Sequence, residues 1–205
     1  MTPSIQPVVL RNGSEVVDPL GAVLGFLERW NFDVGPPSGS SSFSESDLRR
    51  ANRGGARISA AEVAAVLARR QAIERALRTI AVDASLAEAD TSVPWLPLYQ
   101  LFDAFADIRG IGFAKMTKAL HSKRPALIPM LDSVVQKYLR DDDLGVNAPF
   151  GERALGLVRG YKRDLDLNRD ALRAIRLGTA GHGYELTEVR ILDLLIWSVE
   201  VASDA

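Results

Sequence analysis

The sequence contains no cysteine. This absence excludes disulfides, thiolate zinc sites and cysteine nucleophiles, and it excludes an iron–sulfur cluster bound by cysteines. With only two histidines among 205 residues, a metal site would depend on carboxylates, so we expect neither a metal nor another cofactor. The lack of cysteine also fits a reducing compartment, and we expect a cytoplasmic protein.

Long apolar runs are missing as well. The most apolar segment, residues 190–202, is interrupted by Arg190, Asp193 and Glu200, and it is too short and too charged to span a bilayer. The N-terminal residues lack the basic region and the apolar core of a signal peptide. We therefore expect a protein without membrane association.

Positive and negative charges nearly balance over the whole chain, but one segment is strongly basic. The net charge is −1, which does not suggest a general nucleic-acid binder. Residues 109–140, however, hold seven basic residues against the single acid Asp132, which gives this segment +6. A basic stripe on a neutral protein is typical of a local binding surface for an anionic partner. The alternative is a solvated helix face.

Signals for strands are few, and helical spacing of apolar residues dominates. We predict an all-α, multi-helix globular fold that forms a single helical domain over residues 1–205, with an extended N-terminal arm at residues 6–10 and a mobile loop at 35–43. Serines followed three positions later by an acid, Ser44 with Asp47 and Ser59 with Glu62, predict two helix starts. The predicted helices cover residues 19–30, 60–80, 85–88, 94–107, 133–140, 150–166, 169–177 and 186–202, and one more begins at about residue 113.

Two glycines, Gly110 and Gly112, flank one apolar residue before a basic helix. Glycines there permit positive φ and allow a phosphate to approach the backbone, and the positive end of the helix then points at that phosphate. Lys115 and Lys118 are three residues apart and share a face of this helix. The pattern predicts a contact with a DNA backbone that does not depend on base sequence. The alternative is an ordinary tight turn between two helices.

The segment resembles the helix-hairpin-helix DNA glycosylase superfamily, whose usual motif is Leu-Pro-Gly-Val-Gly-Arg-Lys-Thr-Ala followed by an apolar run into Val-Asp-Thr-His. The matching residues here are Ile108 to Met116, Arg124-Pro125 and Met130 to Ser133. The distance from the first glycine to the aspartate matches the endonuclease III type without a gap. The resemblance implies a central helix-hairpin-helix, with the hairpin and a candidate site at residues 95–140.

In that superfamily the aspartate lies at a helix start beside the flipped nucleotide, so the resemblance implies that Asp132 is the catalytic carboxylate. An ionised carboxylate can stabilise positive charge that develops on a sugar carbon, once the target base has left the stack. The alternative is that Asp132 is only a helix N-cap. The chain departs from the motif at two positions: Ala114 stands where bifunctional members have a lysine nucleophile, so no lyase activity is implied, and Val134 replaces the histidine.

The chain also looks like an uncharacterised bacterial protein family that shares more of its length. The shared residues are Gly110-Ile-Gly112, Lys123-Arg124-Pro125, Ile128-Pro129, Asp132 to Val135, and a final helix with Arg190, Asp193 and Trp197. Arg190 and Asp193 are three residues apart on a helix and could pair with each other or with the hairpin. We expect a surface ion pair, which would contribute little stability, and we expect Trp197 to pack in the core.

The sequence thus leaves three hypotheses open. The first is a monofunctional DNA glycosylase that removes a damaged or modified base. The second is a non-catalytic module that binds DNA or another protein, and the third is a helical protein that binds no nucleic acid. For the first, we predict Asp132 as the catalytic residue. The predicted DNA-binding residues are Gly110, Gly112, Lys115, Lys118, His121, Lys123 and Arg124; His121 has the alternative role of a helix C-cap.

Overall fold

The computed structural model describes residues 5–29 and 40–203. In these ranges the protein is mostly helical, as the sequence predicts, with ten α-helices, two short 3₁₀ helices and one two-stranded sheet. The elements are β1 (Val8–Val9), β2 (Glu15–Val16), α1 (Pro19–Arg29), α2 (Glu45–Arg53), α3 (Ala60–Ala68), α4 (Arg70–Arg78), η1 (Asp90–Ser92), α5 (Trp95–Asp103), α6 (Phe113–His121), α7 (Ser133–Tyr138), η2 (Arg140–Asp142), α8 (Phe150–Leu167), α9 (Arg169–Gly181) and α10 (Glu188–Ser203).

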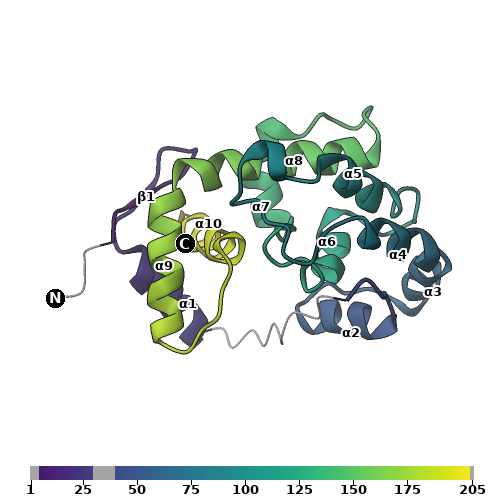
Figure 1. Ribbon diagram of the computed structural model, residues 1–205, viewed down its shortest axis with the longest axis horizontal. Helices are drawn as coiled ribbons and strands as arrows, with labels where there is room; N and C mark the ends of the chain where they lie inside the picture. Colours follow the sequence, from purple (N-terminus) through teal and green to yellow (C-terminus); the bar gives the residue numbers. More distant parts are fainter. Residues whose placement is uncertain (1–4, 30–39, 204–205) are drawn as a thin grey trace.

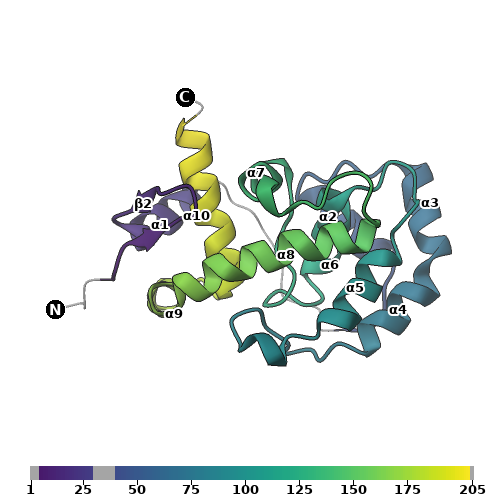
Figure 2. The ribbon, with the colours of Figure 1, turned by 90° about the horizontal axis from the view of Figure 1, so that it is seen from above.

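The first and last segments of the described chain pack together. β1, β2, α1, α9 and α10 lie on one side of the molecule, α2 to α6 lie on the other, and the long helix α8 runs between them (Figures 1 and 2). α10 packs against α1 and α9 on one flank and against α7 on the other. The start of α7 therefore lies where the two sides of the molecule meet.

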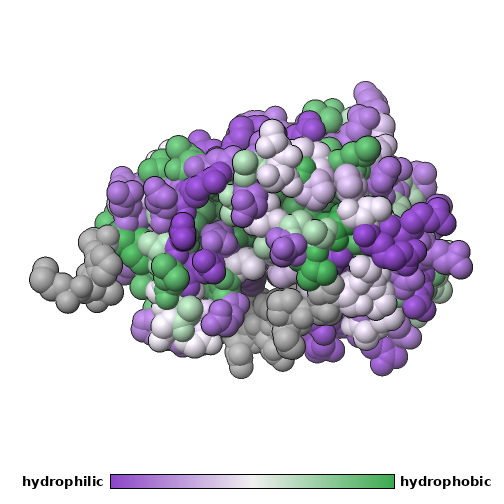
Figure 3. Space-filling view, in the orientation of Figure 1, coloured by the Kyte–Doolittle hydropathy of each residue, from purple (hydrophilic) through white to green (hydrophobic). Residues whose placement is uncertain are grey.

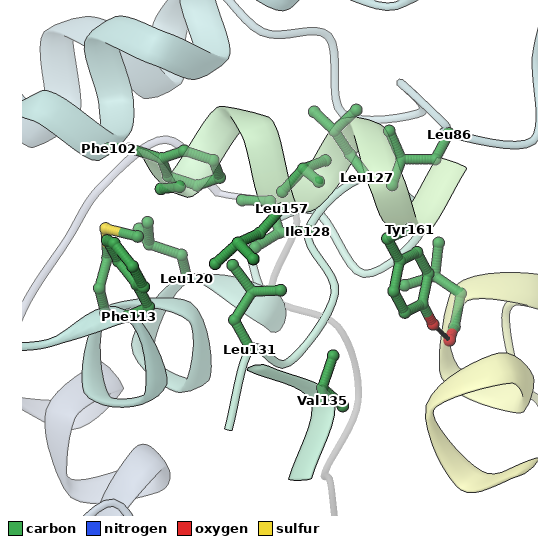
Figure 4. Packing of buried hydrophobic residues seen from close by; sticks show 14 of the residues in the cluster. Leu86, Phe102, Phe113, Leu120, Leu127, Ile128, Leu131, Val135, Leu157 and Tyr161 are labelled. Carbon is green, nitrogen blue, oxygen red and sulfur yellow. Dashed lines mark hydrogen bonds between the residues drawn. The ribbon is translucent and has the colours of Figure 1, made fainter. Parts of the chain in front are cut away.

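A single cluster of buried apolar side chains extends through both sides. Figure 4 shows its centre, where Phe102 of α5, Leu120 of α6 and Leu157 of α8 converge with Leu131, which precedes α7. The segment that links α6 to α7 contributes Leu127, Ile128 and Leu131, which are fully buried. Burial on this scale fixes the segment in place, because each large apolar side chain contributes about 1.5–3 kcal/mol on transfer from water. Polar residues gather at the surface instead, notably at the α3–α4 end in Figure 3.

Both predicted serine caps are confirmed. The backbone N–H of Ser44 donates to Asp47 Oδ2 at 2.8 Å. At the start of α3, the N–H of Ser59 donates to Glu62 Oε2 at 2.7 Å, and the N–H of Glu62 donates to Ser59 Oγ at 3.4 Å. These reciprocal bonds satisfy amides that a helix start leaves open, and they hold the Glu62 side chain beside its own helix start.

One predicted helix is divided in the structure, and another is missing. The run from 60 to 80 is two helices, because Arg69 between them has ψ of 5° and turns the chain. Residues 85–88 form no helix, since tertiary partners take their backbone groups. The N–H of Leu86 donates to the carbonyl of Ala126 at 2.9 Å, and Lys162 Nζ donates to the carbonyls of Leu86 and Glu88 at 3.1 and 2.9 Å.

Gly178 does not end a helix, which corrects the predicted boundary at residue 177. It lies inside α9, and a Cβ at this position would lie 3.0 Å from Leu20 Cδ2 of α1. The glycine therefore allows α1 and α9 to approach closely. The helix ends instead before Gly183, which has φ of +84° and thus the left-handed conformation that glycine adopts at low cost.

The two loosely structured segments of the prediction are more ordered than expected where the structure describes them. Within residues 6–10, Val8 and Val9 pair antiparallel with Val16 and Glu15. Of the loop at 35–43, residues 35–39 lie outside the described residues. Its end is fixed, because Phe43 is fully buried and its N–H donates to Glu74 Oε1 at 2.8 Å.

Candidate functional site

The glycine turn, residues 108–112, connects the α5 region to α6 and exposes the amino end of α6. Gly110 has φ of +84°, and Gly112 is the N-cap of α6 with an extended conformation. Gly112 is exposed, and no heavy atom lies within 4 Å of the position that its Cβ would occupy. Gly112 provides no side-chain cap for this helix, and a helix amino end favours an anion through its dipole.

The helix before this turn ends earlier than the sequence predicts. α5 ends at Asp103 rather than near Ile108. Backbone bonds from Phe105 and Ala106 continue as turns, and Asp107 has φ of +60°, a conformation that interrupts a right-handed helix. The connection between α5 and α6 is therefore a longer turn than the predicted tight reversal.

The two lysines predicted to share a helix face both have partners. Lys115 Nζ lies 2.6 Å from Glu62 Oε1 of α3. Lys118 Nζ donates to the backbone carbonyl of Gly54, just after α2, at 3.0 Å. Both side chains are half-buried, so the basic face of α6 is directed partly toward α2 and α3.

His121 and Lys123 lie inside the protein. His121 Nδ1 is 2.7 Å from the carbonyl oxygen of Ile128. The pKa of His121 is lowered to about 4, chiefly by burial and also by the charge of Arg190, against the effect of the Ile128 hydrogen bond. The ring is therefore neutral at physiological pH and does not supply a positive charge. Lys123 Nζ forms a buried ion pair with Asp47 Oδ1 at 2.7 Å.

Arg124 is fully buried and binds the carboxyl end of α4. Its Nη2 donates to the carbonyl oxygens of Leu77 and Ile80, both at 2.8 Å. A guanidinium in this position satisfies carbonyls that a helix end leaves open. Because Arg124, Lys123 and His121 are all enclosed by protein atoms, we assign them structural roles and leave them out of the interface proposed below.

The basic stripe of residues 109–140 is thus divided between surface and interior. Arg109, Lys137 and Arg140 are exposed, while the charges of Lys115 and Lys123 are matched by acids from earlier helices. The local excess of positive charge at the surface is therefore smaller than the +6 of the sequence. Its most exposed member beside the glycine turn is Arg109.

Asp132 is held by three hydrogen-bond donors at the start of α7. Its Oδ1 accepts from the backbone amides of Val134 and Val135, both at 3.1 Å. Its Oδ2 accepts from Trp197 Nε1 of α10 at 2.9 Å. Asp132 is half-buried. The predicted N-cap is thus present, and in addition the carboxylate is tied to the last helix.

A second carboxyl group lies close to Asp132 in the interior. Asp193 Oδ1 accepts from Tyr161 Oη at 3.0 Å, and its Oδ2 accepts from the N–H of Met130 at 3.3 Å. The pKa of Asp193 is raised to about 7, chiefly by burial and also by the charge of Asp132, while Arg190 and the hydrogen bonds from Met130 and Tyr161 oppose the shift. The single hydroxyl proton of Tyr161 is shared between two acceptors, because the carbonyl oxygen of Val189 also lies 2.5 Å from Oη. Asp193 therefore anchors the chain just before Asp132.

Arg190 and Asp193 are not a surface pair, which corrects the prediction. The Asp193 side chain is 1% exposed and that of Arg190 is 12% exposed, and the closest distance between the charged groups is 3.9 Å. Arg190 Nη1 also lies 3.8 Å from Met130 Sδ. Trp197 packs edge-on against Phe26 of α1 with ring centroids 6.5 Å apart. Trp197 packs against the core as predicted, but it is partly exposed and its indole N–H also binds Asp132.

Sequence reasoning did not connect Trp197 or Tyr161 with Asp132. One signal was available: Asp193 and Trp197 are four residues apart and share a face of α10. Nothing in the sequence indicates that this face lies against the start of α7, since the two segments are separated by 65 residues.

A surface hollow of about 410 Å³ lies elsewhere, between η2 and α8, and its lining includes neither Asp132 nor the glycine turn. Its charged groups come from Asp141, Asp142, Glu152, Arg159 and Arg163. Residues 5–29 and 40–203 contain no cluster of three or more metal-binding side chains. No helix in these ranges is long and apolar enough to cross a membrane.

A protein-family model matches most of the chain. Residues 27–200 match the model described as "Family of unknown function (DUF6308)". No curated protein and no solved structure matches the chain. The family match covers the glycine turn, Asp132 and Trp197, and it assigns none of them a role.

Proposed function

Because the chain belongs to the DUF6308 family, whose function is unknown, we propose a function from its own residues: a DNA-binding helix-hairpin-helix protein with a base-removing site at Asp132. One observation supports this most. The carboxylate of Asp132 is fixed by two amides and the Trp197 indole at the meeting point of two sides of the fold. A carboxylate held by the amides of a helix amino end and by a third donor has a fixed orientation.

The α6 amino end would bind the DNA backbone. The exposed Gly112 leaves room for a phosphate at the first amides of the helix, and the exposed Arg109 adds a positive charge nearby. Contacts of this kind hold a strand in position without selecting its sequence. Asp132 follows α6 in the chain and is coupled to it, since the N–H of its neighbour Leu131 donates to Thr117 Oγ1 of α6 at 3.0 Å.

The proposed reaction is hydrolysis of an N-glycosidic bond. The bond between the base and the sugar carbon breaks, the departing base takes a proton, and the oxygen of a water molecule forms the new bond to the sugar carbon. Asp132 would stabilise the positive charge on the sugar and accept the proton of the attacking water. Ala114 occupies the position of the lysine nucleophile in bifunctional enzymes, so the proposed activity is monofunctional. The target base would have to leave the stack first.

A second candidate, a non-catalytic DNA-binding module, is favoured by a different observation. Both carboxylate oxygens of Asp132 already accept hydrogen bonds from the protein, and the hollow of about 410 Å³ lies away from it. The same capping bonds would occur in a protein that keeps Asp132 only to start α7.

Two measurements separate these candidates. Binding to a short labelled duplex should weaken as salt rises, with a slope of about 0.9 in log K per phosphate contact; no binding at low salt would refute both. Base release from a panel of damaged and modified duplexes then tests catalysis. Asp132→Asn keeps an oxygen for the two α7 amides, so it should bind DNA and release no base.

Asp141→Asn is the matched control, because it removes one acid from the same stretch at a side chain that is 89% exposed. The control should release base at the wild-type rate. Wild-type protein that binds DNA and releases no base from any duplex would favour the non-catalytic module.

A further inference from the structure

An acid from a different helix lies against the glycine turn. Glu62 Oε1 would be only 2.1 Å from a Cβ at Gly110, so the carboxylate touches backbone that glycine alone leaves bare. The same oxygen accepts from Lys115 Nζ at 2.6 Å. The helix that begins at Ser59 thus delivers a negative charge to the place where the turn and the basic helix meet.

The two oxygens of this carboxylate have different tasks. Oε2 accepts from the N–H of Ser59 and completes the cap of α3, while Oε1 binds Lys115. The cap itself needs only one acceptor at this position, and a glutamine side chain could supply it. The negative charge therefore matters chiefly for Lys115. The hydrogen bond from Lys115 lowers the pKa of Glu62 first, and the Ser59 amide lowers it further, so the group is ionised at neutral pH.

We propose that Glu62 is an internal anion that masks Lys115 in the free protein, and that a phosphate group of bound DNA displaces it. This inference rests on the DNA-binding function proposed above. Carboxylate and phosphate oxygens compete for the same ammonium group, and the lysine stem can reorient between them. The exposed Gly112 side of the α6 amino end remains open, so a phosphate can reach the helix amides before Lys115 changes partner.

The contact would set the strength of DNA binding. The ion pair is partly accessible, with Glu62 15% and Lys115 22% exposed, so exchange of its partners does not require the protein to unfold. Each molecule that binds DNA must separate this pair, and Glu62 then remains beside the incoming phosphate. Both effects reduce affinity, and both disappear when the charge of Glu62 is removed.

The test compares Glu62→Gln with the wild type in binding to a short fluorescent duplex at low salt. Glutamine keeps the α3 cap and removes the charge, so the variant should bind about two- to fivefold more tightly, the range expected for an accessible ion pair. Glu45→Gln is the control, because Glu45 also pairs with a basic residue, Arg49, but at an exposed site near the start of α2. It should bind like the wild type.

A second measurement does not depend on DNA. Acylation of lysine amines, followed by mass spectrometry, should modify Lys115 faster in Glu62→Gln than in the wild type, because the amine is then no longer held in the ion pair with Glu62. Thermal melting of each variant checks that the fold is intact.

The outcomes distinguish the two proposals. Tighter binding by Glu62→Gln than by the wild type supports the masking role. If the wild type binds and the folded variant binds equally or more weakly, the masking role is refuted while the DNA-binding function stands. If neither protein binds the duplex at low salt, the proposed function fails, and the masking role fails with it.

Discussion

The indole nitrogen of Trp197 donates to Oδ2 of Asp132 at 2.9 Å. This bond joins the last helix to the start of α7, and it leaves the carboxylate held from two sides, by α7 amides and by α10. Phe26 of α1 contacts the same tryptophan. The orientation of Asp132 therefore depends on how the N-terminal and C-terminal segments pack together.

Replacing Trp197 with phenylalanine should test this dependence. The variant keeps an aromatic ring against Phe26 but loses the donor to Asp132. Hydrogen bonds to charged groups contribute about 1.5–3 kcal/mol, so we expect the free energy of unfolding to fall by about that amount, as measured by urea denaturation. Trp95→Phe is the control, because Trp95 packs under Arg159 with its ring centroid 5.2 Å from the guanidinium carbon. Equal losses in the two variants would contradict a specific role for the bond.

The two glycines of the turn should respond differently to alanine. At Gly110, φ is +84° and a Cβ would meet Glu62 Oε1 at 2.1 Å, so Gly110→Ala should destabilise the protein by about 1–3 kcal/mol. At Gly112 the space is open and φ is −99°, so the loss should stay below about 1 kcal/mol. If Gly112 faces a phosphate, its alanine variant should instead weaken DNA binding. Thermal melting and duplex titration separate the two effects, and an equal loss of stability would count against this assignment.

Arg124 should matter for stability and not for DNA binding. Arg124→Met would leave the carbonyls of Leu77 and Ile80 without their buried donor, at a cost of about 3–5 kcal/mol. Exposed Arg109 has no comparable role, so Arg109→Gln should change stability by less than about 0.5 kcal/mol but should weaken duplex binding. Urea denaturation gives the stabilities, and titration of the folded fraction gives the affinities. If folded Arg124→Met loses DNA affinity, Arg124 is part of the DNA interface and the assignment of a purely structural role is wrong.

The start of α6 and the N-cap at Asp132 could be predicted from sequence because both depend on residues within one or two turns. Glycine, serine and aspartate act on their own backbone, so a short motif is enough to identify them. The burial of Lys123 and Arg124 could not be predicted in this way. A long basic side chain has the same sequence signal on a surface as inside a protein. Its place was decided by Asp47 and by the end of α4, which lie far away in the chain.

The contacts around Asp132 follow the same rule. Trp197 of α10 binds Asp132, and Tyr161 of α8 binds the neighbouring Asp193, but no periodic pattern indicates which helix faces meet across the molecule. The differences from the predicted helices have a similar origin. Residues 85–88 form no helix because Lys162 binds the carbonyls of Leu86 and Glu88, and Gly178 lies inside a helix because Leu20 of α1 packs against it. Local chemistry thus indicated the residues of the candidate site, and tertiary packing decided which of them reach the surface.

The raised pKa of Asp193 predicts a pH dependence of stability. Its ordinary pKa is 3.8, and in the folded protein burial raises it to about 7. The folded state therefore holds the proton more tightly than the unfolded state between these values. The stabilising contribution of Asp193 is complete below about pH 4 and is lost as pH rises to about 7, because the unfolded chain ionises first. Tyr161, Arg190 and Asp132 face the group, and the charge of Arg190 together with the hydrogen bonds from Met130 and Tyr161 opposes the shift.

Asp193→Asn should remove this dependence, because the amide has nearly the same shape as the protonated acid and does not ionise. The stability of the variant relative to the wild type should increase by more than about 1 kcal/mol from pH 4 to pH 7, and the difference should then level off. Urea denaturation over this pH range provides the measurement. Asp141→Asn, at an exposed site, should give a curve parallel to the wild type. A parallel curve for Asp193→Asn as well would show that Asp193 is ionised throughout, and Arg190 would then be the group that keeps its charge inside the protein.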